Sequence, residues 1–281
     1  MTELASPPSL LPLYAKAAVT GPLHRGDSLP DSRYTLAPQA IDPEHLAAYQ
    51  RVCGFRTTDL LPPTYLHVLA FPVTVALMTE SAFPFPLIGM VHVGNAITVA
   101  RPVRSDEQVA FAVRAGDLRP HPAGRQLDLL VDATVDGETV WSGRSTYLRR
   151  GGKPSERTKD KPPRDGRADA PAALVRVPDD IGRRYGGVSG DRNPIHLSGL
   201  SAKAFGFKSA IAHGMWLKAR TVAALEGRLP DAYTVDVRFK TPVFLPSTIE
   251  ITAARSDAGW TLDVRNARND KPHLSGAVSR G

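Results

Sequence analysis

The feature that most constrains the fold of this chain is an internal repeat. Five short segments of the first half recur in the second half, in the same order and at offsets between 133 and 146 residues. An ordered set of matches is hard to produce by chance and indicates one fold used twice. The matched segments are 49–54 with 185–190, 66–67 with 212–213, 101–103 with 241–243, 127–128 with 262–263 and 142–143 with 275–276.

Between the two halves lies a segment of different composition. Residues 151–171 are rich in Gly, Pro and charge, include Gly151-Gly152 and Pro162-Pro163, and have no apolar periodicity. Such a composition is typical of a linker, because it cannot bury a hydrophobic face. We therefore predict two domains, 1–150 and 172–281, joined by a linker over 151–171.

The charge of the chain is concentrated near this linker. The net charge is +7, and residues 149–170 hold eight basic and four acidic side chains, so this stretch contributes +4. A basic flexible segment can bind nucleic acid. No aromatic interleaving or recognition motif accompanies it, so we interpret the stretch as a solvated linker and predict no nucleic-acid partner.

Cysteine usage and the hydropathy pattern indicate the compartment. The single cysteine, Cys53, excludes an intramolecular disulfide framework and a cysteine-based zinc site, and it suits a reducing cytosol. Residues 1–13 lack a basic leader and are interrupted by prolines, which is unlike a signal peptide. No run approaches the roughly 18–20 apolar residues of a membrane span. We expect a cytoplasmic protein without a membrane span.

Each half has the same predicted order of elements. A short helix (43–52; 178–187) precedes a longer apolar helix (64–79; 213–227), and strands follow. In the second half the strands are expected at 233–241, 248–255, 261–267 and 273–278, between turn signals. The longer helix of each half is apolar nearly all round, so it should be buried. The pattern predicts an α+β fold with antiparallel sheets wrapped around a buried central helix in each half.

One stretch of the second half brings chemically useful residues together. Asp191, Asn193 and His196 lie within six positions. Pro194 favours an extended or turn conformation at Asn193, and Gly190 permits backbone geometry that other residues resist. A carboxylate and an imidazole aimed at one point are the usual parts of general acid–base catalysis. The alternative is that Asp191 caps the next turn and His196 is an ordinary loop histidine.

This stretch resembles the signature of the MaoC-like dehydratases, the hydratase 2 family of the hot-dog fold. The family pattern is a Tyr, one to three residues, a small residue, then Gly-Asp-x-Asn-Pro-hydrophobic-His, and residues 185–196 fill every fixed position. A second family element follows at 206–215, where the longer helix should begin. The resemblance is detailed over 172–281 and architectural over 30–150, since the family includes double hot-dog members with a degenerate first half.

The resemblance implies reversible hydration of a trans-2-enoyl thioester to an (R)-3-hydroxyacyl thioester. Asp191 and His196 would hold the reacting water, one removing its proton while the other supplies a proton to the α-carbon, and Asn193 would orient the pair. The amide of Gly214, at a helix N-terminus, would stabilise the developing enolate. The sequence has no zinc, nucleotide or flavin motif, so no metal or cofactor is expected.

Further residues are candidates for substrate contacts. His213 has two readings, a packing role at the helix start or direct contact with the substrate, and Tyr185 is interpreted as structural. Lys208, Lys218 and Arg220 could meet the phosphates of coenzyme A or the acidic surface of an acyl carrier protein, or they are ordinary surface groups. The predicted substrate-binding set is Gly190, His213, Met215 and Lys208.

The first half lacks the catalytic residues. By the repeat alignment, Phe55 stands at the position of Asp191 and Val68 at that of Gly214. The loop is also shorter, with 13 positions from Gly54 to His67 against 23 from Gly190 to His213. We expect a non-catalytic half that widens the groove for long acyl chains. Five apolar residues could line it or form plain core: Phe71, Val75, Met78, Phe83 and Phe85.

Two other functions compete with the dehydratase. A hot-dog thioesterase would share the fold and release free thiol from its substrate. A non-catalytic acyl-thioester-binding protein would have no need of the paired acid and base at Asp191 and His196. The sequence leaves open the carrier, the acyl chain length and assembly into a homodimer.

Overall fold

The computed structural model describes residues 1–20, 26–151 and 173–281, so almost all of the predicted linker lies outside it. The first half has three helices, α1 (Leu10–Thr20), α2 (Pro43–Cys53) and α3 (Pro63–Met78). Its strands are β1 (Thr2–Leu4), β2 (Arg33–Gln39), β3 (Met90–Val99), β4 (Val109–His121), β5 (Gly124–Val135) and β6 (Glu138–Arg150).

The second half repeats this order with two added short helices. Its helices are α4 (Ile181–Ser189), α5 (Pro194–Leu197), α6 (Gly199–Ala204) and α7 (Gly214–Ala223). Its strands are β7 (Ala173–Val177), β8 (Tyr233–Phe239), β9 (Ser247–Ser256), β10 (Gly259–Asn266) and β11 (Pro272–Arg280). The four strands predicted for this half are confirmed within about two residues at most ends. α7 ends four residues before the predicted helix does.

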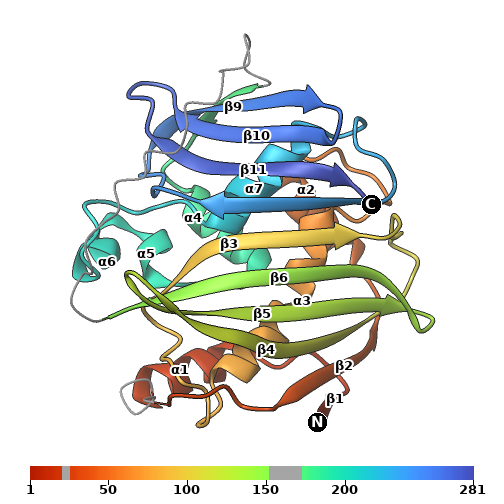
Figure 1. Cartoon of the computed structure of the whole chain (residues 1–281), viewed down its shortest axis with the longest axis vertical. Helices are drawn as coiled ribbons and strands as arrows, with labels where there is room; N and C mark the ends of the chain where they lie inside the picture. The colour runs from red at the N-terminus through yellow and green to blue at the C-terminus, as the bar shows by residue number, and fades with distance from the viewer. Residues whose placement is uncertain (21–25, 152–172) are drawn as a thin grey trace.

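The strands of the described residues form one 11-stranded sheet, which is the broad layer of Figure 1. Its order is β1-β2-β4-β5-β6-β3-β8-β11-β10-β9-β7, and only the short β1–β2 pair is parallel. The sheet of each half therefore continues into the other where β3 pairs with β8, with Thr98 opposite Thr234. The sequence predicted the antiparallel sheets but not this seam between them.

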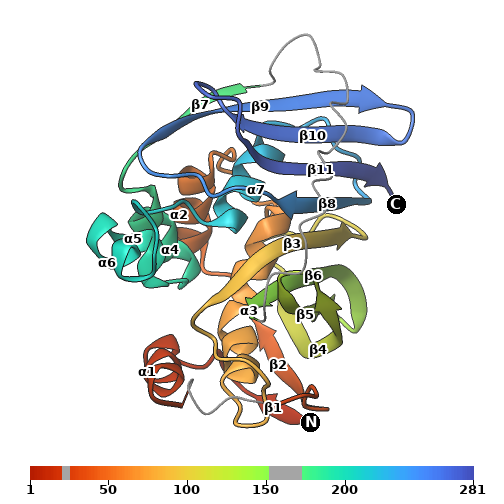
Figure 2. The ribbon, with the colours of Figure 1, turned by 60° about the vertical axis from the view of Figure 1, so that its left-hand side comes forward.

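The helices lie on one side of this curved sheet, with α3 and α7 against its concave face (Figure 2). Most side chains of α3 are buried, as the apolar sequence predicted. The helix begins at Pro63, because proline suits the first helical position. Among residues 1–20, 26–151 and 173–281, no helix is long and apolar enough to cross a membrane.

Equivalent backbone contacts show how the two halves correspond. The amide of Leu61 donates to the carbonyl of Val103 at 2.9 Å, and the amide of Ala212 donates to that of Val243 at 2.9 Å. Leu61 therefore matches Ala212, two residues before each central helix begins. The position equivalent to Gly214 is Pro63, and the sequence alignment of Val68 with Gly214 was wrong by more than one helical turn. His67 lies inside α3 rather than before it.

The first matched segment of the repeat is confirmed in its backbone. Gly54 ends α2 with φ +76°, and Gly190 ends α4 with φ +74°. Both lie in the left-handed region, where glycine is favoured because it has no Cβ. From there the chains diverge: nine positions separate Gly54 from the start of α3, but 24 separate Gly190 from the start of α7. The longer loop carries α5, α6 and three of the predicted catalytic residues, Asp191, Asn193 and His196.

Candidate active site

The loop after α4 fixes Asp191 and Asn193 through local hydrogen bonds. The amide of Asp191 donates to Ser189 Oγ at 3.2 Å, and the amide of Asn193 donates to Asp191 Oδ1 at 3.2 Å. Asn193 Oδ1 in turn accepts from the amide of Ile195 at 3.4 Å and caps α5. Asn193 thus holds the loop that carries the acid and the histidine.

This loop can lie directly on α4 because of a glycine in that helix. A Cβ built on Gly182 would overlap the backbone carbonyl of His196. Any larger residue at position 182 would push α5 away from α4, and His196 would move with it. The second half therefore needs glycine here for packing, a signal that the sequence analysis did not use.

His196 is buried, and its ring has a defined orientation. Its Nδ1 atom lies 2.8 Å from the carbonyl oxygen of Ile211. A carbonyl accepts only, so Nδ1 carries the proton and Nε2 keeps a lone pair. Burial lowers the pKa of His196, and the nearby charge of Asp191 opposes this shift. The ring is therefore neutral at pH 7 and able to accept a proton at Nε2.

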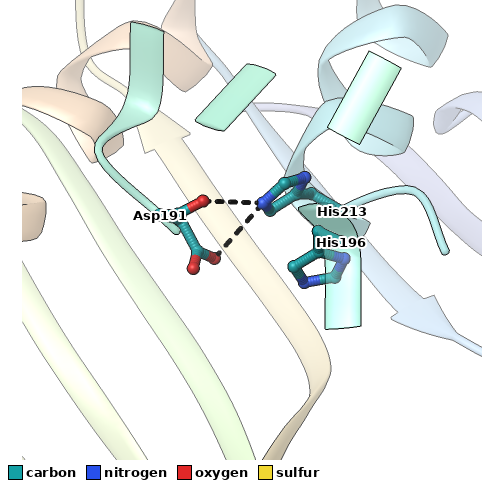
Figure 3. A group of neighbouring side chains, drawn as sticks. All are labelled: Asp191, His196 and His213. Carbon is teal, nitrogen blue, oxygen red and sulfur yellow. Dashed lines mark hydrogen bonds and ion pairs between the residues drawn. The ribbon is translucent and has the colours of Figure 1, made fainter. Parts of the chain in front are cut away.

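His213 supports both members of this pair. Its Nε2 atom lies 2.9 Å from the backbone oxygen of Asp191 and 3.9 Å from a carboxylate oxygen of the same residue (Figure 3). Its ring stacks on that of His196, with centroids 3.6 Å apart. Burial lowers its pKa well below the usual value. These contacts are with protein groups and support the positioning role. Tyr185 packs its ring 4.9 Å from His213.

The N-terminus of α7 presents a backbone amide at the same place. His213 is the N-cap residue, so Gly214 is the first residue of the helix and its N–H has no intrahelical partner. A Cβ at position 214 would lie 3.2 Å from the Phe239 ring, so the absence of a side chain keeps this end of the helix open. The equivalent Pro63 has no N–H at all. Only the second half therefore offers a donor here.

These groups face one cavity of about 440 Å³. Of the predicted site residues, Gly190 and Lys208 do not line it, although Lys208 Nζ lies 4.4 Å from the ring centroid of Phe244, which does. The cavity has walls from both halves. Its lining includes Asp191, Asn193, His196, His213, Gly214 and Met215 from the predicted site, with His67, Val68, Phe71, Met90, His92, Tyr147, Phe239, Thr241 and His273 beside them.

The structure corrects one sequence prediction about the surroundings of the site and decides between two alternatives for another. Lys218 is not at the surface, because its side chain is 0% exposed and bonds to backbone and side-chain oxygens beneath the sheet. Of the five apolar residues proposed for the groove, only Phe71 lines the cavity. The other four are buried core residues: Val75, Met78, Phe83 and Phe85.

Three side chains are close enough to invite a metal ion. The donor atoms of Asp191, His196 and His213 all lie within 4.8 Å of one another. Zinc, however, needs each imidazole nitrogen at about 2.0–2.1 Å along its ring plane. The two rings are stacked, with an interplanar angle of 27°, so their lone pairs run side by side instead of converging. The group fits an acid–base site better than a metal centre.

The fold and the site together define a class: a duplicated α+β domain in which one half carries an acid–base pair beside an open helix N-terminus. The family model described as MaoC like domain matches residues 157–274. A curated relative, 3-hydroxyacyl-thioester dehydratase X of Mycobacterium tuberculosis, is 38% identical over 271 residues, which are 95% of each chain. This chain belongs to the MaoC-like dehydratase family.

Solved structures agree with this assignment. The crystal structure of HtdX from Mycobacterium tuberculosis superimposes with a TM-score of 0.79 at 38% identity, covering 89% of this chain and 100% of that one. A MaoC-like dehydratase from Phytophthora capsici superimposes with a TM-score of 0.73 at 19% identity, covering 90% and 96%. The latter likeness shows the fold alone. The predicted double hot-dog architecture is confirmed.

Proposed function

We propose that the chain is a 3-hydroxyacyl-thioester dehydratase that interconverts (R)-3-hydroxyacyl and trans-2-enoyl thioesters without a cofactor. The observation that carries this proposal is that three residues line one cavity together: Asp191, His196 and Gly214. This elimination needs a base for the α-proton and a group that orients the leaving hydroxyl. It also needs a hydrogen-bond donor for the charge that develops on the thioester oxygen. The name of the curated relative supports the same reaction.

The protonation of His196 gives each group a role. In dehydration, Nε2 of His196 takes the proton from the α-carbon, and the charge that develops on the thioester oxygen is stabilised by the Gly214 amide. The C3–O bond then breaks, and the proton on Nε2 passes to the departing hydroxyl, which leaves as water. Asp191 accepts a hydrogen bond from this hydroxyl and orients it. Hydration is the reverse sequence.

The first prediction concerns the reaction itself. Purified protein should hydrate crotonyl-coenzyme A with loss of enoyl absorbance and no release of free thiol, and chiral analysis should find the (R)-3-hydroxy product. The stereochemistry follows if Asp191 and His196 approach the same face of the substrate, as the family resemblance implies. Thiol release without hydration would favour the thioesterase, and a predominantly (S) product would contradict the assignment.

The first half would supply the wall for the acyl chain. It has Pro63 at the oxyanion position, so it offers no second site, but its α3 and β3 line the cavity through Val68, Phe71 and Met90. These side chains are apolar and come from the first half, whereas Gly214 and Met215 line the cavity from α7. We propose that the chain packs against them while the thioester carbonyl sits at Gly214.

The second prediction tests this wall. Val68→Phe should lower kcat/KM for a C16 enoyl thioester more than for a C4 one, because each methylene denied burial loses about 0.8 kcal/mol, or roughly fourfold in binding. Comparing both substrates in the same variant cancels any loss of folded protein. An equal loss on both chain lengths would mean that the first half only supports the fold.

The acyl carrier, the cellular location and the oligomeric state remain predictions from the sequence. Coenzyme A and acyl carrier protein both present the thioester on the same phosphopantetheine arm, and Lys208 near Phe244 is the candidate contact for its phosphate. A cytosolic location and assembly as a homodimer are likewise proposed. Comparing kcat/KM for the same acyl chain on coenzyme A and on acyl carrier protein would show which carrier the enzyme prefers.

A further inference from the structure

A second pocket lies at the other end of the second-half sheet from the active site. Its volume is about 570 Å³, and it is formed by the turn after α7 and by the adjoining ends of β9, β10 and β11. In Figure 1 these strand ends lie at the right, near the C-terminus, whereas α5 and α6 lie at the left. His273 of β11 lines the active-site cavity and Ser279, six residues further along, lines this pocket, a separation of about 20 Å. The two sites share no lining residue.

The charge of this pocket is positive. Three arginines line it, Arg228, Arg255 and Arg280, and all three are exposed. Within the described part of the chain, no acidic residue lines the pocket, and none of these guanidinium groups has an ion pair or a hydrogen bond. Arg265, further along β10, pairs instead with Asp263. Like charges that gather without a counter-charge repel one another, so a bound anion would relieve the repulsion.

The strand register places an aromatic ring among these arginines. Trp260 of β10 is two residues before the buried Leu262, so its side chain points to the same face of the sheet. Arg255 of β9 is its direct partner on one side, and Val278 of β11 is its partner on the other. Arg280 is two residues beyond Val278 and points to the same face. The half-buried Trp260 ring packs partly against the core and also lines the pocket.

The size of the pocket and its ring distinguish between kinds of anion. Pockets of roughly 300–1,000 Å³ hold small organic ligands, and an inorganic phosphate ion would fill only a small part of such a space. The planar guanidinium fork binds phosphate oxygens in pairs. A tryptophan ring stacks on a flat base. Unpaired arginines and a tryptophan at one pocket are together the groups that a nucleotide needs.

We infer that this pocket binds a nucleoside diphosphate, with the phosphates on Arg228, Arg255 and Arg280 and the base against Trp260. The pocket contains none of the acid–base groups of the active site. The inference therefore does not depend on the proposed dehydratase function.

The experiment is a calorimetric titration of the full chain with ADP, adenosine and pyrophosphate. ADP should bind at one site and at least about tenfold more tightly than either fragment, because each fragment makes only part of the contacts. Arg255→Gln and Arg280→Gln should each weaken ADP binding about tenfold or more, the usual effect of losing a hydrogen bond to a charged group. Trp260→Leu should weaken ADP to the affinity of pyrophosphate, and retained pyrophosphate binding shows that this variant is folded.

Arg238→Gln is the matched control, because Arg238 is exposed on the other face of the sheet and lines neither site. It should bind ADP as the wild type does. S-crotonyl-pantetheine carries an acyl group but no nucleotide, so it should leave ADP affinity unchanged.

Four results would each overturn the inference. They are no ADP binding at about 1 mM, wild-type affinity in Arg255→Gln, pyrophosphate binding as tight as that of ADP, and displacement of ADP by S-crotonyl-pantetheine. Absence of hydratase activity would leave the titration unchanged, so failure of the proposed function is distinguishable from failure of this inference.

Discussion

Asp191→Asn and His196→Gln should each lower kcat by about 10²–10⁴-fold, the usual contribution of a general acid or base. His196→Gln removes the Nε2 lone pair that takes the α-proton. Asp191→Asn removes the charge that orients the leaving hydroxyl. Both replacements are close in size to the original residues, so the circular dichroism spectrum and melting temperature should change little.

The two effects should be strongly non-additive, because both groups act on the same water. The double variant should therefore be only slightly slower than the slower single one. Asp257→Asn, in the exposed turn between β9 and β10, is the matched control and should keep wild-type activity. Retention of more than a tenth of wild-type kcat by either folded single variant would remove that residue from the mechanism.

The pH profile gives an independent check on His196. Its pKa is lowered by burial, so the imidazole stays neutral down to a pH below its ordinary value of 6.5. Protonation of the base stops the reaction, so the acid limb of the kcat/KM profile should fall below pH 6.5. In His196→Gln the residual activity should lack this limb.

Local signals in the sequence were sufficient for the elements of the second half. Runs of β-branched residues are separated by the turn at 257–259 and by Pro-containing turns around 246 and 272. Turn signals on both sides of such a run are sufficient to locate a strand. The catalytic loop was also predictable, because Gly190, Asp191, Asn193 and His196 lie close together in sequence. Their local hydrogen bonds then fix them in space.

Contacts between distant segments were not predictable. The pairing of β3 with β8 joins residues 136 positions apart at Thr98 and Thr234, and no local pattern marks which strand edge continues into the other half. His92 of β3 meets the ring of Phe239 of β8 across this seam, and both residues line the cavity. A lone histidine in a strand carries no sequence signal of that kind.

Two of the wrong predictions concern residues that carry a local signal. Pro62-Pro63 marks a helix start, since proline favours the first helical position, whereas the match of His67 with His213 shifts the two helix starts out of alignment. The longer helix of the second half was also predicted to be buried, because it is apolar nearly all round. A lysine at its centre, Lys218, should therefore have been expected inside, where it needs partners.

Lys218→Met should be among the most destabilising single substitutions in the chain. The Lys218 side chain is 0% exposed, and its Nζ donates to Asn95 O at 3.0 Å, Asn95 Oδ1 at 2.5 Å and Val235 O at 3.0 Å. These oxygens accept from the Lys218 Nζ group, and burial lowers the pKa of this group well below its usual value. Asn95 lies on β3 and Val235 on β8, so the lysine of α7 ties the two halves together directly beneath their seam.

Methionine fills similar space but removes the donor group that bonds these three oxygens, and a buried polar group left without its partner typically costs about 1–3 kcal/mol. At about 2–4 °C per kcal/mol for a chain of this size, the melting temperature should fall on the order of 10 °C.

Lys203→Met on the exposed face of α6 is the control, and it should change stability by less than about 0.5 kcal/mol. Asn95→Leu should cost less in the Lys218→Met background than in the wild type, because the two residues share one network. Strictly additive losses, or a melting temperature within 2 °C of the wild type for Lys218→Met, would show that the seam is held by strand pairing and apolar packing alone.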